Sequence, residues 1–144
     1  IGCGREGNFL KTISSFIKKG IGFDEKAEDS KNPKYEIKRF HILENIPTGN
    51  ESCDIVTMLA VLEHLSNPQT VLNESFRILR KGGKLILTSP SPLARPILEF
   101  LAFRLKMIDK KEIEDHKNYF WPKDIKNMLF KSGFEENNIK YWRK

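Results

Sequence analysis

Three glycines and one aspartate are the residues of this chain whose types and spacing most directly predict chemistry. Gly2, Gly4 and Gly7 form the pattern G-x-G-x-x-G, and Asp24 follows the last of them by 17 residues. A glycine turn lets a ligand lie directly against the backbone, and a helix that starts after it offers free N–H groups to an anion. A carboxylate at the end of the next strand accepts the hydroxyl hydrogens of a ribose, although Asp24 could instead cap the residues after it. These residues predict a nucleoside-binding site.

The elements that must position these residues alternate between helix and strand. Apolar residues recur at helical spacing after the glycine turn, and shorter apolar runs follow. The first half of the chain is expected to contain a helix at 7–19, strands at 21–23 and 35–42, at most a short helix at 25–34, and a loop at 46–52.

The second half repeats this alternation. The apolar run at 54–59 is typical of a strand buried on both faces. Asn67 and Pro68 predict the start of a helix that Gly82 ends. Its expected inner face comprises Val71, Leu72, Phe76 and Leu79. The remaining expected elements are a strand at 84–89, an apolar helix at 97–108, a helix from Pro122 that buries Ile125, Met128 and Leu129, and a strand at 134–142.

Alternating strands and helices predict an α/β domain, with a mostly parallel, doubly wound sheet between two layers of helices. A glycine turn of this kind follows a central strand, yet only Ile1 precedes it. The chain also stops soon after its last expected strand. We therefore expect residues 1–144 to be one partial domain from which the first and last strands are missing.

Composition excludes several classes of protein. The net charge is +6, but the lysines are scattered, so we expect a solvated basic surface and no nucleic-acid partner. No apolar stretch approaches the roughly 18–20 residues that cross a bilayer. Cys3 and Cys53 suit neither a zinc motif nor a disulfide framework, and we expect them to be buried thiols in a reducing cytoplasm.

Five segments, taken in order, resemble the motifs of class I S-adenosylmethionine-dependent methyltransferases of the type 11 group, which have a Rossmann-like fold. They are Ile-Gly-Cys-Gly-Arg-Glu-Gly at 1–7, Ile-Gly-Phe-Asp at 21–24, and the segments 54–65, 76–90 and 116–134, the last of which begins with the motif at 116–125 and ends with Ser-Gly-Phe. Two acids of the family pattern are absent. One would precede Ile1, and the other would stand at His41 or Ile42, so adenine contacts are expected from the backbone and apolar groups of Ile42 and Leu43.

The resemblance implies S-adenosylmethionine as the cofactor and in-line methyl transfer to an oxygen, carbon or nitrogen atom of a small or lipid-linked acceptor. Glu63, His64 and Pro90 are expected to border the acceptor pocket. His116 is the candidate base and Tyr119 the group that orients the acceptor. The expected cofactor-binding residues are Gly2, Cys3, Gly4, Gly7, Asp24, Ile42, Leu43, Leu59 and Ala60.

Some relatives bind a metal through two glutamates and a histidine, but Ala60 replaces the first glutamate here, so no metal is expected. The segment 92–120, which is apolar at 92–108, is expected to cover the substrate or to pack against another part of the protein. Two other functions stay open: half of a nicotinamide-dependent oxidoreductase, or a degenerate, non-catalytic binding module. The sequence predicts no oligomeric state.

Overall fold

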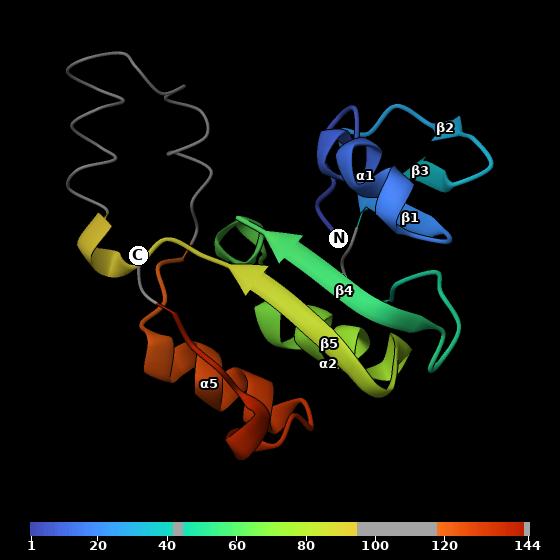
Figure 1. Cartoon of the computed structure of the whole chain (residues 1–144). Coiled ribbons are helices and arrows are strands. Elements are labelled where there is room, and N and C mark those ends of the chain that lie inside the picture. Colours follow the sequence, from blue (N-terminus) through green and yellow to red (C-terminus); the bar gives the residue numbers. More distant parts are fainter. Residues whose placement is uncertain (42–44, 95–117, 143–144) are drawn as a thin grey trace, which may run out of the picture.

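The structure is a computed structural model that describes residues 1–41, 45–94 and 118–142 (Figure 1). The chain alternates short helices with strands. The α-helices and strands are α1 (Asn8–Ile13), β1 (Gly20–Asp24), β2 (Ser30–Lys31), β3 (Tyr35–Arg39), β4 (Cys53–Leu59), α2 (Pro68–Ile78), β5 (Leu79–Thr88) and α5 (Pro122–Lys131). The 3₁₀ turns are η1 (Ser14–Phe16), η2 (Leu62–His64), η3 (Pro92–Ala94) and η5 (Glu136–Asn138).

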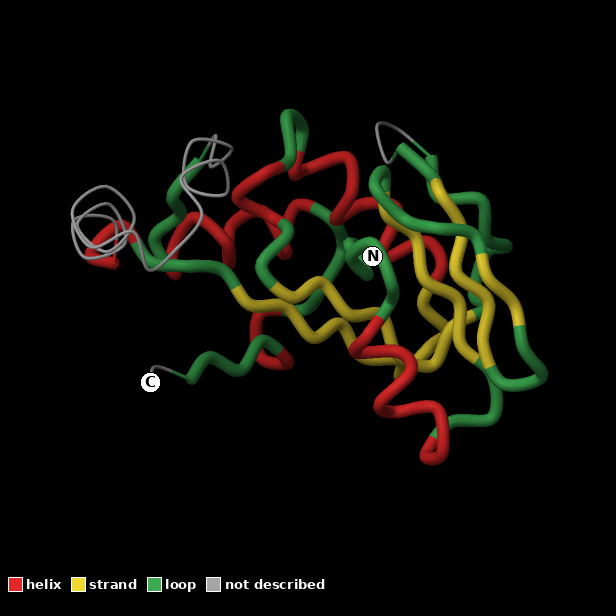
Figure 2. The backbone as a smooth tube through the Cα atoms, turned by 90° about the horizontal axis from the view of Figure 1, so that it is seen from above, coloured by secondary structure: helices red, strands yellow, loops and turns green. Residues whose placement is uncertain are grey.

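The described strands form two sheets. In the first, β1 pairs in parallel with β3, and β2 adds to β3 in the antiparallel sense. In the second, β4 pairs in parallel with β5. The parallel pairs confirm the α/β class. Residues at the start of the chain contact both sheets: the Gly2 amide donates to the Phe23 carbonyl at 2.8 Å, and the Ile1 nitrogen donates to the Thr57 carbonyl at 2.9 Å. Figure 2 shows this end of the chain between the two groups of strands.

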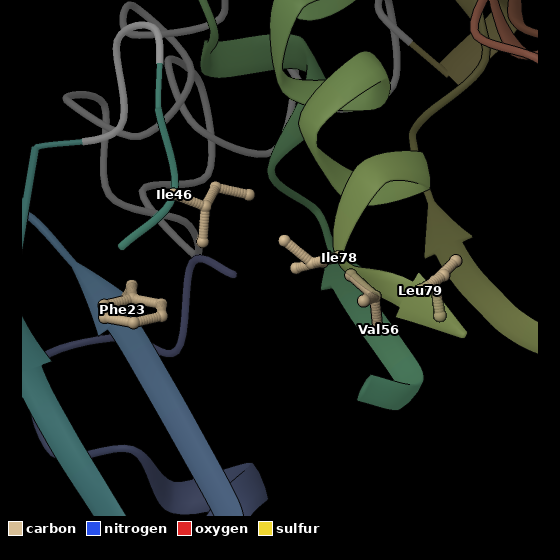
Figure 3. Packing of buried hydrophobic residues seen from close by; sticks show 5 residues of the cluster. All are labelled: Phe23, Ile46, Val56, Ile78 and Leu79. Carbon is tan, nitrogen blue, oxygen red and sulfur yellow. The ribbon is translucent and has the colours of Figure 1, made fainter. Parts of the chain in front are cut away.

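Two apolar clusters make up the core. The first draws on β1, β4, α2, β5 and the loop before β4, and consists of Phe23, Ile46, Val56, Ile78 and Leu79 (Figure 3). The second lies between the β4–β5 sheet and the helices α2 and α5, and consists of Met58, Leu62, Val71, Leu72 and Leu129. Ile1 packs against both clusters, so the start of the glycine turn rests on the core.

The loop before β4 is held to α2 by an ion pair. The Arg77 guanidinium donates to the Glu74 carboxylate at 2.7 Å and to the carbonyls of Ile46 and Thr48. The Glu74 carboxylate in turn accepts the Ile46 amide at 2.8 Å. The hydrogen bond from Arg77 holds the pKa of the Glu74 carboxyl below its ordinary value. The pair thereby fixes Ile46 in the first cluster.

Several expected elements have different bounds. The helix expected at 7–19 is wrong beyond Ile13, where η1 follows, because the Ser14 hydroxyl bonds the Lys11 carbonyl and competes with the helix. No helix forms at 25–34, in line with the expectation of at most a short one, and the strand β2 lies there instead. Asn32 accepts the amides of residues 34 and 35 and makes the tight turn between β2 and β3.

The boundary between α2 and β5 differs too. Asn67 caps α2 as predicted, but the helix ends at Ile78, so Leu79 opens the strand instead of lying on the helix face. Gly82 and its neighbour lie inside β5, at an irregularity in its pairing with β4. Phe76 is half-exposed and contacts the Phe134 ring, with centroids 5.0 Å apart, so it is not on the inner face.

Two further expectations about strands are wrong. The strand β4 is buried on one face only, because Ile55 is 56% exposed, and Ile86 on β5 is 48% exposed. Within the described part of 134–142 there is no strand, and η5 forms instead because Asn138 bonds the backbone and side chain of Glu135. The helix α5 buries Leu129 as predicted. The helix expected at 97–108 lies outside the described residues.

Candidate functional site

The Asp24 carboxylate points into the glycine turn. Its Oδ2 atom accepts the Gly4 amide at 2.8 Å, and its Oδ1 atom accepts the Lys26 amide at 2.9 Å. The carboxylate therefore faces the turn and also caps the residues that follow it, and its contact with a ribose stays a prediction. Two backbone donors fix the orientation of the carboxylate, which leaves its remaining lone pairs in a defined position.

The three glycines of the turn have different surroundings. All have positive φ angles, at 65°, 73° and 63° for Gly2, Gly4 and Gly7. A Cβ atom at Gly2 would lie 2.2 Å from Val61, and one at Gly7 would lie 2.3 Å from Ile37, so these two glycines permit close packing within the protein. A Cβ atom at Gly4 would have no heavy atom within 4 Å. Gly4 therefore leaves open space beside Asp24, as a bound ligand requires.

Cys3, which lies between Gly2 and Gly4, is turned toward the protein. Its amide donates to the Phe23 carbonyl at 3.1 Å, and its side chain packs where a Cβ atom of Gly22 would stand. Burial raises the pKa of the Cys3 thiol, and the nearby charge of Asp24 raises it further. The thiol is therefore a packing group at the base of the turn.

An open hollow of about 370 Å³ lies next to Asp24, where β1 and β3 end; its lining is Glu25, Lys26, Arg39, Phe40 and His41. The Arg39 guanidinium donates to the Glu25 carbonyl at 3.0 Å, and His41 lies 3.1 Å from the Glu25 carboxylate. The volume of this hollow falls in the range of pockets that bind small ligands. Sequence reasoning missed these residues, although the carboxyl ends of parallel strands are the common place for a ligand. The predicted Ile42 and Leu43 lie outside the described residues.

The end of β4 brings Leu59 and Ala60 to the other side of the turn. Leu59 pairs with Thr88 of β5, and the Ala60 amide donates to the carbonyl and hydroxyl oxygens of Thr88 at 3.1 and 3.0 Å. Ala60 has a φ angle of 53°, which is unusual for a residue with a side chain. Val61 follows it and lies against Gly2. These contacts place the end of β4 beside the glycine turn.

The turn η2 holds two more predicted residues, Glu63 and His64. Glu63 is 1% exposed, and its carboxylate oxygens have no hydrogen-bond partner within the described ranges. The Ser89 hydroxyl, which precedes the half-buried Pro90 after β5, is buried and equally unpartnered in that part of the chain. A native structure pairs most of its buried polar atoms, so two such groups near the ends of neighbouring strands indicate a missing polar contact.

Asn118 joins the last part of the chain to η2. Its amide donates to the Glu63 carbonyl and its side chain to the Leu65 carbonyl, both at 3.1 Å. Tyr119, the next residue, is half-buried, and its role stays a prediction. His116 lies outside the described residues. Within 1–41, 45–94 and 118–142, no group of three or more metal-ligating side chains gathers, and no helix is long and apolar enough to span a bilayer.

Comparison with known proteins matches the sequence of this chain to a family. A family described as "Methyltransferase domain" matches residues 1–137. A ubiquinone biosynthesis O-methyltransferase of Aliivibrio fischeri is 28% identical over 94 residues, which are 62% of this chain and 39% of the relative. A demethylmenaquinone methyltransferase of Alkalihalophilus pseudofirmus is 24% identical over 132 residues, which are 81% of this chain and 56% of the relative.

Solved structures give the same result for the fold. A SAM-dependent methyltransferase of Thermotoga maritima superposes with a TM-score of 0.63 at 24% identity, over 94% of this chain and 61% of that chain. This likeness confirms the Rossmann-like fold. Across the three relatives, the chain spans between 39% and 61% of their length.

Proposed function

The chain belongs to the methyltransferase domain family, and from this premise we propose that the protein transfers a methyl group to a small acceptor molecule. Membership of the family implies S-adenosylmethionine as the cofactor. The observation that supports the proposal most directly is the Asp24 carboxylate, which faces a turn where Gly4 leaves open space. These residues fit the sugar of an adenosyl group, because the fixed carboxylate can accept its hydroxyl hydrogens.

Each side of the turn would hold a different part of the cofactor. The volume of the hollow beyond Asp24 suits the adenine ring of the cofactor, and Phe40 would give that ring an apolar surface. Leu59 and Ala60 would border the other end, beside Gly2. When bound, the cofactor supplies a sulfonium methyl group already activated for in-line displacement. The protein's own residues then need only to align the acceptor and to exclude water.

The acceptor would lie near η2. Glu63, His64 and Pro90 are proposed to border its pocket, with Tyr119 to orient it and His116 as the base if a proton must leave. The contacts of Asn118 with η2 support this arrangement, since Asn118 directly precedes Tyr119 in the chain. A buried carboxylate without a partner is unfavourable, and a hydrogen-bond donor on the acceptor would relieve that cost. The segment 92–120 is proposed to cover the pocket. Residues 1–144 are proposed to be part of a single domain.

A quinone-like or other lipid-linked acceptor is the substrate class that we favour. Two relatives carry names from ubiquinone and demethylmenaquinone methylation, and the segment 92–120 is rich in apolar residues that suit such a molecule. We expect no nucleic-acid partner and no metal. We also propose a cytoplasmic location, which the two unpaired cysteines support.

Calorimetry tests the proposal against the nicotinamide alternative. The protein is titrated with S-adenosylmethionine, S-adenosylhomocysteine and NADH in separate experiments. We expect both adenosyl ligands to bind and NADH not to bind. NADH contains a pyrophosphate, which the glycine turn of an oxidoreductase must hold and the turn of a methyltransferase need not hold. A protein that bound neither adenosyl ligand would contradict the proposed function, and binding without transfer to quinol acceptors would favour a non-catalytic module.

A further inference from the structure

Thr88, the last residue of β5, makes an unusual contact with the residue that follows β4. Both its carbonyl oxygen and its hydroxyl oxygen accept the amide of Ala60, at 3.1 and 3.0 Å. The two strands are in register from Ile55 to Leu59, which lies opposite Thr88. The carbonyl bond extends the pairing of β4 and β5 past the end of β4, and the hydroxyl adds a second acceptor for the same amide.

The residue that donates to this second acceptor, Ala60, has a strained backbone. Ala60 has a φ angle of 53°, and this left-handed conformation is unfavourable for any residue with a Cβ atom. Such a conformation persists only where surrounding contacts enforce it, and strained residues of this kind cluster at ligand sites. The Thr88 hydroxyl contributes to this, because together with the Thr88 carbonyl it fixes the direction of the Ala60 amide and so anchors the peptide plane at which this conformation begins.

The conformation of Ala60 decides where the chain goes next. Val61 lies directly against Gly2, so close that a Cβ atom at Gly2 would be 2.2 Å from a Val61 methyl carbon. Gly2 has a φ angle of 65° and begins the glycine turn that leads to Gly4. A different φ angle at Ala60 would redirect Val61 and remove the surface on which the turn rests.

We propose that Thr88 is a positioning residue for the cofactor site, whose hydroxyl holds Ala60 in its left-handed conformation and thereby keeps Val61 packed beneath Gly2. Thr88 acts through Ala60 and Val61, not by contact with the reacting atoms. The inference rests on the proposed function in one respect, namely that the ligand of the turn is an adenosyl compound.

Three variants test it: Thr88→Val, Thr88→Ser, and Thr88→Val combined with Ala60→Gly. Valine puts a methyl group where the hydroxyl oxygen was, and serine retains the oxygen. Glycine adopts a positive φ angle without support, so it removes the need for the hydroxyl. Two quantities are measured for each: the Kd of S-adenosylhomocysteine by calorimetry, and the amide hydrogen exchange of residues 2–4 and 60–62.

We expect Thr88→Val to weaken S-adenosylhomocysteine binding about tenfold and to speed exchange in both segments, because the left-handed residue loses a contact that enforced it. Thr88→Ser should bind within about twofold of the wild type. The double variant should recover most of the lost affinity and protection. If Thr88 had only a structural role, Thr88→Val would lower the melting temperature and the added Ala60→Gly would not restore the affinity.

Two results would overturn the proposal: wild-type affinity and exchange in Thr88→Val, or a double variant that binds no better than Thr88→Val. If the wild type itself binds no S-adenosylhomocysteine, the proposed function fails, and hydrogen exchange alone decides about Thr88. Faster exchange at 60–62 that Ala60→Gly reverses would then support the positioning role, and unchanged exchange would overturn it.

Discussion

The carboxylate of Asp24 and the amide of Gly4 are joined by a hydrogen bond of 2.8 Å across the glycine turn. The acid expected to bind the ribose therefore also shapes the backbone on which the ligand would lie. Oδ1 accepts the Lys26 amide, so the carboxylate cannot rotate freely. Turn and acid form one unit, and a change in either should affect ligand affinity.

Replacing Asp24 with asparagine should weaken S-adenosylhomocysteine binding by about 10- to 100-fold, because a charged acceptor forms stronger hydrogen bonds than an amide. Calorimetry measures the Kd. Asp124→Asn is the matched control, since Asp124 also accepts a backbone amide, that of Trp121, but on α5. It should leave the Kd unchanged. Equal losses of affinity in the two variants would contradict the assignment of Asp24.

Gly4→Ala should abolish binding of S-adenosylhomocysteine while the protein still folds. A Cβ atom there meets no protein atom and fills the space that the ligand needs, at a cost of about 1 kcal/mol for the positive φ angle. Gly82→Ala is the control, because Gly82 has a similar φ angle of 78° and equally open surroundings in β5. Both variants should lose similar stability in urea unfolding, and only the first should lose the ligand. Retained binding in Gly4→Ala would place the ligand elsewhere.

Glu63→Leu should raise the free energy of unfolding by about 1–3 kcal/mol in the absence of substrate, because it removes a buried carboxylate without a described partner. Urea unfolding measures the change. Glu136→Leu, at an exposed glutamate of η5, should alter stability by less than about 0.5 kcal/mol. A Glu63→Leu variant less stable than the wild type would show that the fold needs this carboxylate.

Stability in acid should depend on Glu74. A carboxyl whose pKa is lower in the folded state stabilises the fold above its unfolded pKa of about 4.3. That contribution is lost as the pH falls through the lowered folded pKa. Glu74→Gln should therefore cost about 1–2 kcal/mol at pH 7, and its difference from the wild type should shrink below pH 4.

Urea unfolding of the wild type and Glu74→Gln at pH 7 and pH 3 gives this difference. Glu136→Gln, with its exposed side chain, serves as the control and should follow the wild type at both pH values. A Glu74→Gln variant whose deficit stays constant between the two pH values would contradict the role assigned to the ion pair with Arg77.

The glycine turn and Asp24 could be predicted because their constraints are local. A positive φ angle selects glycine, and the spacing to the next strand end places the acid. The end of α2 could not be predicted in the same way, since Leu79 suits a helix face as well as a buried strand. The hollow lined by Phe40 and His41 was missed because it forms only when β1 and β3 lie side by side.

The sequence also did not indicate which charged groups are buried. Nothing in the segment around Glu63 distinguishes a carboxylate at 1% exposure from one in solvent. The left-handed Ala60 gave no signal either, because alanine is a residue that sequence patterns assign to ordinary helix or strand. Both features depend on contacts with β5 and Asn118, which are distant in the chain.

Gly2 is held on two sides: its amide bonds the Phe23 carbonyl of β1, and its α-carbon lies against Val61 after β4. One residue without a side chain is thus common to both sheets. Any ligand that immobilises this residue restricts the relative motion of the two sheets as well. Saturation with such a ligand should therefore make the halves of the domain melt in a single, sharper transition.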